Sequence, residues 1–426
     1  MSARAGYSLA ARANRPDNAQ VHNDTKRTVT AVVTCRGTVL GSVGPFGVDS
    51  PHWAEVGQVA RELTERLAVP VMVLRLLSVD GGDGGRGGLV TYHAEALDRP
   101  EAELAPAGTD FAAELADHPL RLAWATPEGL RSALDWASSE LDRLGRPATG
   151  PAEQVKSWNL SGLFRIPTAD GPVWLKTTPP FGVDEAGAIA VFGAADPALV
   201  PGVLAAAPHR VLLEHVAGVD CWGAPEDGML TLVERLAEAQ HALAGRRDPA
   251  LADRTPAALV GAFRELLASG KVTELSPEEL AEAGRLADRL PGLVEELAAC
   301  GLPETAVHGD FHPGNWRFDG ERAVAMDFSD AFHGHPAFDG HRPRPFLGEE
   351  RWAETRGRWV AAWRRLVPGS DPERALELSK PLMHVYYAVR YQEFLDGIEP
   401  SERIYHAGDP AAEIRRALTS AGAVRA

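Results

Sequence analysis

Hydrophobic positions near the start of the chain follow two different periods. Short apolar runs at 29–34, 71–77 and 89–94 are bounded by turn residues, which predicts strands. At 53–67 the apolar residues recur every three or four positions, the spacing of an amphipathic helix. Residues 1–27 are polar and show no period, so we expect a flexible tail there.

A helix is predicted to begin at Thr126-Pro127, because a capping hydroxyl followed by proline starts many helices. It would close an N-terminal α/β domain at residues 28–148. A second group of short strands follows at 155–158, 163–166 and 173–176, joined by tight turns. These strands predict a small antiparallel β lobe.

A further apolar run at 211–218 ends in glycine, and from about residue 226 the apolar spacing becomes helical. Ser276-Pro277 predicts one helix start, and Pro291 is expected to break that helix. We therefore predict an α+β chain. A β lobe with its connection at 149–218 is followed by a largely helical lobe at 219–426.

Composition limits the possible functions. The net charge of -16 argues against a nucleic-acid partner, which needs a basic face. No apolar run is long enough to span a bilayer, and no secretory signal is visible, so we expect a cytoplasmic protein without a membrane partner. Cys35, Cys221 and Cys300 lack ligand spacing and predict reduced structural thiols.

The strongest motif lies between two short apolar runs, at 305–307 and 323–326. It places His308, Asp310 and Asn315 in the order of a kinase catalytic loop, and Asp327 follows the second run. Phosphoryl transfer needs a carboxylate that orients the acceptor hydroxyl, and it needs oxygen ligands for Mg²⁺. Asp310 fits the first role.

Two more residues support this chemistry. Lys176 ends the third strand of the β lobe, where a kinase places the cation for the nucleotide phosphates. Glu185, on the helix predicted after it, is the natural partner of that lysine, although it could also be an exposed glutamate in a first helical turn.

A bound nucleotide would also need groups that cover its phosphates and a segment between the lobes, the hinge, that binds its purine. The turn at 159–162 is not glycine-rich, so its backbone N–H groups, with Ser161 and Gly162, would have to cover the phosphates. The backbone around Glu214, His215 and Val216 is where the purine edge would bind.

With these features in order, the chain resembles the aminoglycoside phosphotransferase family of small-molecule kinases. The run from His308 to Asn315 matches the family signature His-Gly-Asp-x-His-x-x-Asn, and 326–331 and 335–339 match its continuation. The resemblance implies a bilobal protein-kinase-like fold that uses ATP or GTP with Mg²⁺. A protein kinase is disfavoured, because Ala-Pro-Glu is missing and His335-Pro336 leaves no room for a long activation loop.

By this resemblance, Asp310 is the catalytic base and Asn315 and Asp327 bind Mg²⁺. Lys176 binds the α- and β-phosphates, and Asp339 ties down the catalytic loop. The acceptor would be a hydroxyl of an amino sugar, aminoglycoside or nucleoside antibiotic, which would make an antibiotic-resistance role possible. The candidate acceptor residues are Asp330, Tyr391, Gln392, Asp396, Glu399 and His406.

The N-terminal domain resembles the Nudix fold faintly. Part of the Nudix box is in register, at Gly47, Arg61, Glu62, Leu63, Glu65 and Val69. Trp53 and Arg66 replace metal-binding glutamates, so we expect a cap or docking module rather than a pyrophosphohydrolase. Two alternatives to a kinase stay open: a pseudokinase whose cap recruits a partner, and a Nudix-type hydrolase fused to a kinase.

Overall fold

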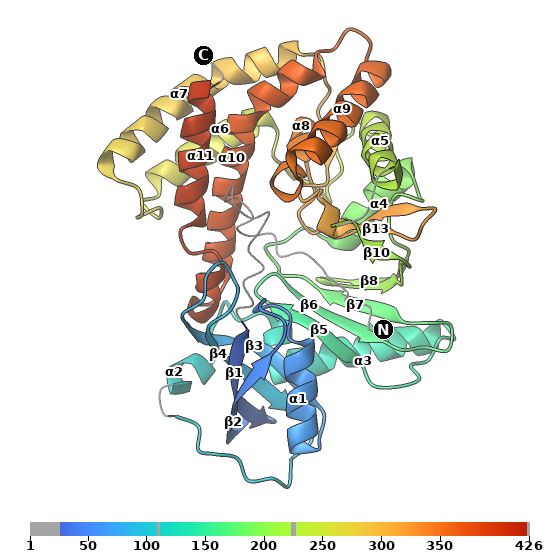
Figure 1. Cartoon of the computed structure of the whole chain (residues 1–426), viewed down its shortest axis with the longest axis vertical. Coiled ribbons are helices and arrows are strands. Elements are labelled where there is room, and N and C mark those ends of the chain that lie inside the picture. Colours follow the sequence, from blue (N-terminus) through green and yellow to red (C-terminus); the bar gives the residue numbers. More distant parts are fainter. Residues whose placement is uncertain (1–25, 109–110, 223–226, 424–426) are drawn as a thin grey trace.

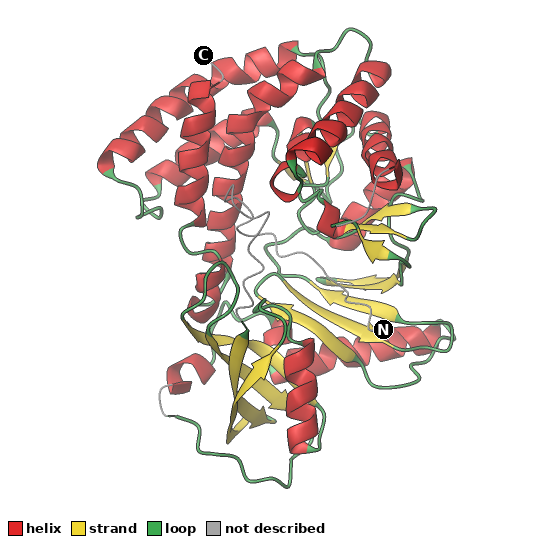
Figure 2. Cartoon of the chain, viewed as in Figure 1, coloured by secondary structure: helices red, strands yellow, loops and turns green. Residues whose placement is uncertain are grey.

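The computed structural model describes residues 26–108, 111–222 and 227–423. Figure 1 shows an N-terminal domain at the bottom, a five-stranded sheet in the middle and a helical part at the top. In Figure 2 most strands lie in the lower two parts and most helices in the upper one. The predicted α+β architecture, with a β lobe, a helical lobe and a preceding α/β domain, is confirmed.

The N-terminal domain contains a sheet with the strand order β2-β1-β4-β3. β1 pairs with β2 antiparallel and with β4 parallel, and α1 covers the sheet through Val59 and Leu63. Most of the predicted tail lies outside the described residues, but Arg27 already belongs to β1 and is buried. The elements of this part are β1 (Arg27–Cys35), β2 (Thr38–Val48), α1 (Gly57–Leu67), β3 (Val71–Asp80), β4 (Leu89–Ala96), α2 (Ala112–Leu115), η2 (Ala123–Ala125) and α3 (Pro127–Arg143).

The β lobe is a five-stranded sheet in the order β5-β6-β7-β9-β8. One face packs on α4 and the helical lobe through Leu163, Val211 and Leu213. The residues between them on the same strands, such as Phe164 and Leu212, point to the other face. The elements are β5 (Glu153–Trp158), β6 (Ser161–Ile166), β7 (Val173–Thr177), α4 (Glu185–Ala195), β8 (Val203–Ala207) and β9 (Arg210–Glu214).

Helix α3 covers the outer face of the five-stranded sheet. Its buried residues Leu130 and Leu141 pack against Phe164 and Leu175 of the sheet, and Figure 1 shows α3 lying along the sheet. The helix begins at the predicted cap, where the Thr126 hydroxyl accepts a hydrogen bond from a backbone N–H group. The sequence placed α3 in the N-terminal domain, but its apolar stripe is buried against the β lobe.

The helical lobe also holds the short strands around the catalytic loop. One prediction here is wrong: α7 continues through Pro291, which is exposed, so the missing hydrogen bond falls on the solvent side. The elements are β10 (Val219–Asp220), α5 (Asp227–Ala242), β11 (Ala252–Asp253), α6 (Pro256–Ala268), α7 (Pro277–Ala299), β12 (Thr305–Val307), η3 (Pro313–Asn315), β13 (Trp316–Phe318), β14 (Ala323–Ala325), β15 (Phe332–Gly334), α8 (Ala337–His341), η4 (Arg344–Phe346), α9 (Glu349–Leu366), α10 (Pro372–Gly397), η5 (Pro400–Tyr405) and α11 (Asp409–Ala423).

A buried ion pair joins the N-terminal domain to the end of α10. Glu399 lies 3.0 Å from Arg121 and 3.5 Å from Arg75, and its side chain is 5% exposed. Close by, the backbone N–H of Leu76 donates to Glu402 of η5. The N-terminal domain therefore contacts the helical lobe as well as the β lobe.

We expect Glu399→Ala to lower the melting temperature by about 10 °C. The substitution leaves two buried guanidinium groups without their carboxylate, and breaking a buried pair costs about 3–5 kcal/mol. Differential scanning calorimetry measures the effect. Glu62→Ala is the matched control, because the Glu62–Arg66 pair is exposed and should change the melting temperature by about 1 °C or less.

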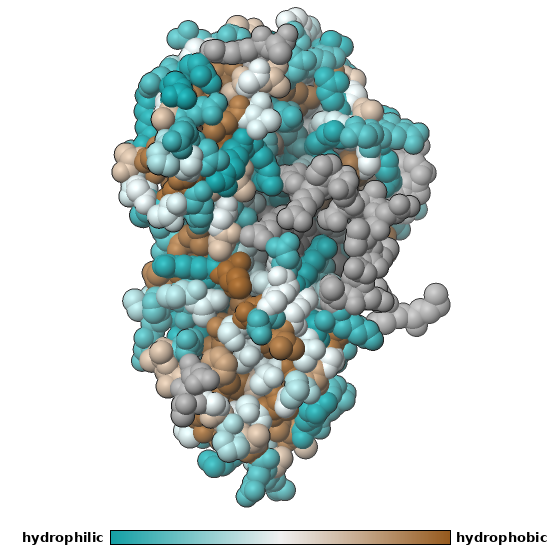
Figure 3. Space-filling view, turned by 60° about the vertical axis from the view of Figure 1, so that its left-hand side comes forward, coloured by the Kyte–Doolittle hydropathy of each residue, from teal (hydrophilic) through white to brown (hydrophobic). Residues whose placement is uncertain are grey.

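The remaining bulk features agree with a globular chain. Cys35, Cys221 and Cys300 are buried and carry free thiols. No helix within the described residues is both long and apolar enough to cross a membrane. The face drawn in Figure 3 mixes hydrophilic and hydrophobic residues, and the hydrophobic ones lie in small groups.

Candidate active site

The catalytic loop connects β12 to β13 and is fixed by hydrogen bonds to Asp339 of α8. The carboxylate of Asp339 accepts hydrogen bonds from the backbone N–H groups of His308, at 2.7 Å, and Gly309, at 3.0 Å. Gly309 has a φ of +83°, and a Cβ atom there would come 2.1 Å from the carbonyl oxygen of Asp330. These contacts fix the loop in the way that was predicted for Asp339.

His308 is part of the scaffold of the loop. Its Nε2 atom lies 3.1 Å from the carbonyl oxygen of Met326, and its Nδ1 atom accepts from the backbone N–H of Asp310 at 3.3 Å. Burial lowers the pKa of His308 to about 4, which keeps the ring neutral. A neutral ring that donates at one nitrogen and accepts at the other satisfies both contacts.

Asp310 lies at the centre of a buried hydrogen-bond network. Its Oδ1 atom accepts from Arg342 at 2.6 and 2.7 Å, and its Oδ2 atom accepts from Asn315 at 2.8 Å. Burial opposes ionisation, but Arg342 and His312 outweigh it and hold the pKa of Asp310 well below its ordinary value. The carboxylate is therefore ionised and can accept a hydrogen bond from a hydroxyl group.

Arg342 was not predicted from the sequence. It follows α8, and its guanidinium lies 4.9 Å from the ring centre of Phe346 and 5.2 Å from that of Tyr387. The aromatic rings and Asp310 together hold the guanidinium in place. No local pattern in the sequence identifies it, because its contact with Asp310 depends on how α8 packs beside the catalytic loop.

A short hairpin brings Asn315 and Asp327 together. Asn315 precedes β13 and Asp327 follows β14 closely, and the backbone N–H of Met326 donates to Asn315 O at 2.8 Å. Within the described part of the chain, the Oδ1 atom of Asn315 is buried and has no hydrogen-bond partner. A buried amide oxygen next to a carboxylate fits the oxygen ligands that Mg²⁺ prefers.

Asp327 also connects the catalytic loop to the β lobe. Its Oδ1 atom accepts from Lys176 at 2.7 Å and from the Ser329 hydroxyl at 2.6 Å. Burial opposes ionisation, but Lys176 outweighs it and lowers the pKa of Asp327. Its φ of +67° is rare for a residue with a side chain, and such strained backbone is found at functional sites.

Lys176 and Glu185 form the ion pair that the sequence suggested. The Lys176 ammonium lies 2.8 and 2.9 Å from the two carboxylate oxygens, and Glu185 also accepts from the backbone N–H of Phe328. Glu185 is 3% exposed, so the alternative of a solvated glutamate is wrong. Burial alone would lower the pKa of Lys176, but Asp327 and Glu185 raise it above its ordinary value.

In the turn between β5 and β6, two of the groups that were expected to cover the phosphates already have protein partners. The Gly162 N–H donates to the Thr177 hydroxyl at 3.1 Å, and the Ser161 hydroxyl accepts from the Trp158 ring at 3.0 Å. Asn159 is fully buried and donates to the Glu402 carbonyl oxygen. We correct the expectation for Gly162, whose N–H is already bonded, and the Asn159 side chain ties this turn to the helical lobe.

The predicted hinge is accessible in part. The backbone N–H of Glu214 donates to Gly202 O at 2.8 Å, and the Glu214 side chain lies 3.4 Å from Arg146. His215 is exposed and Val216 is half-buried, and both follow the end of β9. The Glu214 N–H is thus already bonded, and the purine-edge assignment of the three residues stays a prediction.

The acceptor candidates do not form one cluster. Asp330 is beside the catalytic loop, where Arg390 donates to it at 3.0 and 3.1 Å. Tyr391 is buried and stacks on Tyr387, whose hydroxyl donates to Gly309 O. His406 is buried and stacks on Tyr391.

The other acceptor candidates are held elsewhere. The exposed Asp396 lies 2.7 Å from Lys271 and accepts from Gln392 at 3.0 Å. Glu399 forms ion pairs with Arg75 and Arg121 at the domain junction. Acids at the end of α10 were expected to meet a ligand, but intramolecular cations satisfy them instead.

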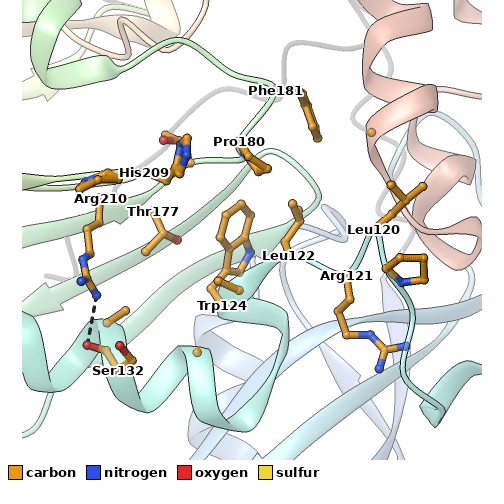
Figure 4. Close-up of a pocket in the computed structure, with 17 residues that line it drawn as sticks. Leu120, Arg121, Leu122, Trp124, Ser132, Thr177, Pro180, Phe181, His209 and Arg210 are labelled. Atoms are coloured by element: carbon orange, nitrogen blue, oxygen red, sulfur yellow. Dashed lines mark hydrogen bonds between the residues drawn. The ribbon is translucent and has the colours of Figure 1, made fainter.

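A cavity of about 590 Å³ lies outside this network, between η2, α3 and the segment after β7. Figure 4 shows Leu122, Trp124 and Phe181 in its wall, with Thr177 at the end of β7. Lys176, the neighbour of Thr177 in the strand, points to the other face of the sheet, where it meets Asp327. The cavity therefore does not contain the residues of the phosphoryl-transfer site.

A lysine, two aspartates and an asparagine in this arrangement are the residue set of kinase-type phosphotransferases. Residues 164–378, slightly more than half of the chain, match the model of the phosphotransferase enzyme family known as APH. The chain belongs to this family and is an enzyme that phosphorylates hydroxyl groups.

Solved structures give further likenesses at low identity. A choline/ethanolamine kinase family protein from Mesorhizobium loti is 18% identical, with a TM-score of 0.48 over 67% of this chain and 98% of that chain. The choline kinase LicA from Streptococcus pneumoniae is 12% identical, with a TM-score of 0.48 over 68% and 98%. A macrolide 2'-phosphotransferase from Brachybacterium faecium is 18% identical, with a TM-score of 0.41 over 65% and 97%. No curated protein matches the sequence.

Proposed function

We propose that this protein transfers the γ-phosphate of ATP or GTP to a hydroxyl group of a small molecule, with Asp310 as the base. One observation supports the proposal above the others. A continuous set of contacts links Glu185, Lys176 and Asp327 in the same site as the Asp310–Asn315 pair. A kinase needs this set complete, whereas a binding module has no use for all of it.

Each residue would have a defined task. The ionised carboxylate of Asp310 orients the acceptor hydroxyl and takes its proton as the bond to phosphorus forms. Lys176, held by Glu185, binds the α- and β-phosphates. Asn315 and Asp327 would hold Mg²⁺, which neutralises charge on the triphosphate when it is bound.

The acceptor class follows the sequence expectation and is open to test. An amino sugar, aminoglycoside or nucleoside antibiotic stays the proposed acceptor, with Asp330 and Tyr391 as the candidates nearest the catalytic loop. Asp396, Gln392 and Glu399 carry less support, because their side chains bind other parts of the protein. The N-terminal domain is proposed to act as a cap that braces both lobes.

An acceptor panel tests this function. The purified full chain is incubated with ATP or GTP, MgCl₂ and single compounds from four groups: amino sugars, aminoglycosides, nucleoside antibiotics and neutral sugars. Products are read by mass spectrometry as the gain of one phosphate. We expect at least one compound to gain phosphate in a nucleotide-dependent reaction. Tight nucleotide binding with no transfer to any compound would instead support the pseudokinase alternative.

A further inference from the structure

A second lysine lies in line with Lys176 on the β lobe. Lys156 of β5 is paired with Leu163 of β6, and Leu163 is paired with Lys176 of β7. Residues paired across antiparallel strands point to the same face of a sheet. Lys156 and Lys176 therefore share the face that meets the catalytic loop, and one strand separates them.

The surroundings of Lys156 agree with this direction. The residue is 6% exposed, and burial lowers its pKa to about 8. The carboxylate of Glu55 opposes this shift most strongly, followed by that of Asp327, and Asp310 acts in the same direction. The ammonium group of Lys156 therefore lies within electrostatic range of the Mg²⁺ ligand and the base of the proposed site.

The N-terminal domain holds the strand that carries Lys156. The Ser157 N–H donates to Ala54 O at 3.1 Å, and Glu55 and Lys156 form an isolated β-bridge. The Glu55 side chain accepts from the Ser50 hydroxyl at 2.5 Å, and Arg27 donates to the Glu55 carbonyl oxygen. A loop of the N-terminal domain thus extends the sheet beside β5 and fixes the backbone of Lys156.

A lysine beside Lys176 would add positive charge to a phosphate site to which the β5–β6 turn contributes little. That turn is fixed by Asn159 to η5, and its Gly162 N–H is already bonded to Thr177. The Gly162 N–H is therefore not free to bind a phosphate, and the turn lacks the several glycines of a glycine-rich kinase loop. A nucleoside triphosphate brings several negative charges, and a buried cation beside Lys176 would neutralise part of them.

We propose that Lys156 is a second phosphate-binding lysine, which acts with Lys176 on the triphosphate of the bound nucleotide. This inference rests on the proposed function, because it requires a nucleoside triphosphate in the site. It also gives the N-terminal domain a role in the reaction, because the segment around Glu55 positions Lys156, which would bind the nucleotide.

Nucleotide affinity, measured without an acceptor, tests the proposal. Isothermal titration calorimetry compares ATP, ADP and adenosine, in the presence of MgCl₂, on the full chain and on Lys156→Met, Lys156→Arg and Lys380→Met. Methionine keeps the length of the side chain and removes its charge. Lys380 is an exposed lysine on α10 and serves as the matched control.

Lys156→Met should weaken ATP binding about 10- to 100-fold, the size expected for a lost charge-assisted hydrogen bond. Adenosine binding should stay within about twofold. Lys156→Arg should recover most of the loss, and Lys380→Met should bind all three ligands like the unmodified protein.

Two results would overturn the inference. Folded Lys156→Met that binds ATP as tightly as the unmodified protein would show that the lysine does not reach the phosphates. An equal loss of ATP and adenosine affinity, together with a lower melting temperature, would show that its role is structural. If the unmodified protein binds neither ATP nor GTP in the same titration, the proposed function itself fails, and the two failures are thus distinguishable.

Discussion

Asp310→Asn should lower the rate of phosphoryl transfer by about 10³-fold, while ATP binding changes little. The carboxylate of Asp310 can take the hydroxyl proton, and the amide of asparagine cannot. Asparagine keeps an oxygen that can accept from Arg342, whereas alanine would leave that buried guanidinium unpaired. The measurement is kcat with the best acceptor, together with ATP affinity by calorimetry.

Asp319→Asn is the matched control for this experiment. Asp319 lies in the exposed turn between β13 and β14, in the same segment as the active site, and its side chain accepts hydrogen bonds from the backbone N–H groups of Glu321 and Arg322. Its substitution should leave kcat within about twofold. If Asp310→Asn retained a tenth or more of the activity, the assignment of Asp310 as base would be wrong.

Asp327→Asn should reduce kcat by about 10²- to 10³-fold and raise the Mg²⁺ concentration needed for half-maximal activity at least about tenfold. Removal of this charge takes away a ligand of the expected metal and one of the two carboxylates on Lys176. Lys176 keeps its contact with Glu185, so the β lobe should stay folded. A magnesium titration of the transfer rate measures both effects.

The magnesium titration also separates the roles of the two aspartates. Asp310→Asn should lower the plateau of the titration without moving its midpoint, because Asp310 is not expected to bind the metal. Asp327→Asn should move the midpoint as well. A midpoint that stays in place for Asp327→Asn would contradict its role as a metal ligand.

The proposed catalytic set could be predicted from sequence because phosphoryl transfer demands certain residue types in a fixed order. His308, Asp310, Asn315 and Asp327 lie within 20 residues of chain. The predicted strands at 305–307 and 323–326 show that His308 and Asp327 each follow the end of a strand. The Lys176–Glu185 pair was inferred from its position after the third strand. The contacts between these residues agree with that inference.

Residues that depend on pairing across elements were harder to predict. Lys156 can be recognised as a candidate only from the strand register, which places it in line with Lys176 across β5, β6 and β7. Arg342 gains its meaning only when α8 places it on Asp310. Neither register nor helix placement follows from a local pattern, because both are decided by tertiary packing.

For the acceptor candidates, tertiary packing removed residues that the sequence had suggested. Glu399 and Asp396 stand near the end of a helix and looked free in sequence, where carboxylates oppose the helix dipole. In the fold, arginines from the N-terminal domain reach Glu399, and Lys271 reaches Asp396. Such long-range ion pairs leave no trace in the spacing of the residues, so sequence alone could not exclude a ligand.

The transfer of the γ-phosphate is tested most directly with isotopically labelled nucleotide. ATP or GTP carrying ¹⁸O in its γ-phosphate is incubated with the full chain, MgCl₂ and the best compound of the acceptor panel, and the product is examined by mass spectrometry. The account predicts a product that gains one phosphate with the label, and no such product with Asp310→Asn. Labelled inorganic phosphate without any labelled product, across the whole panel, would contradict the account.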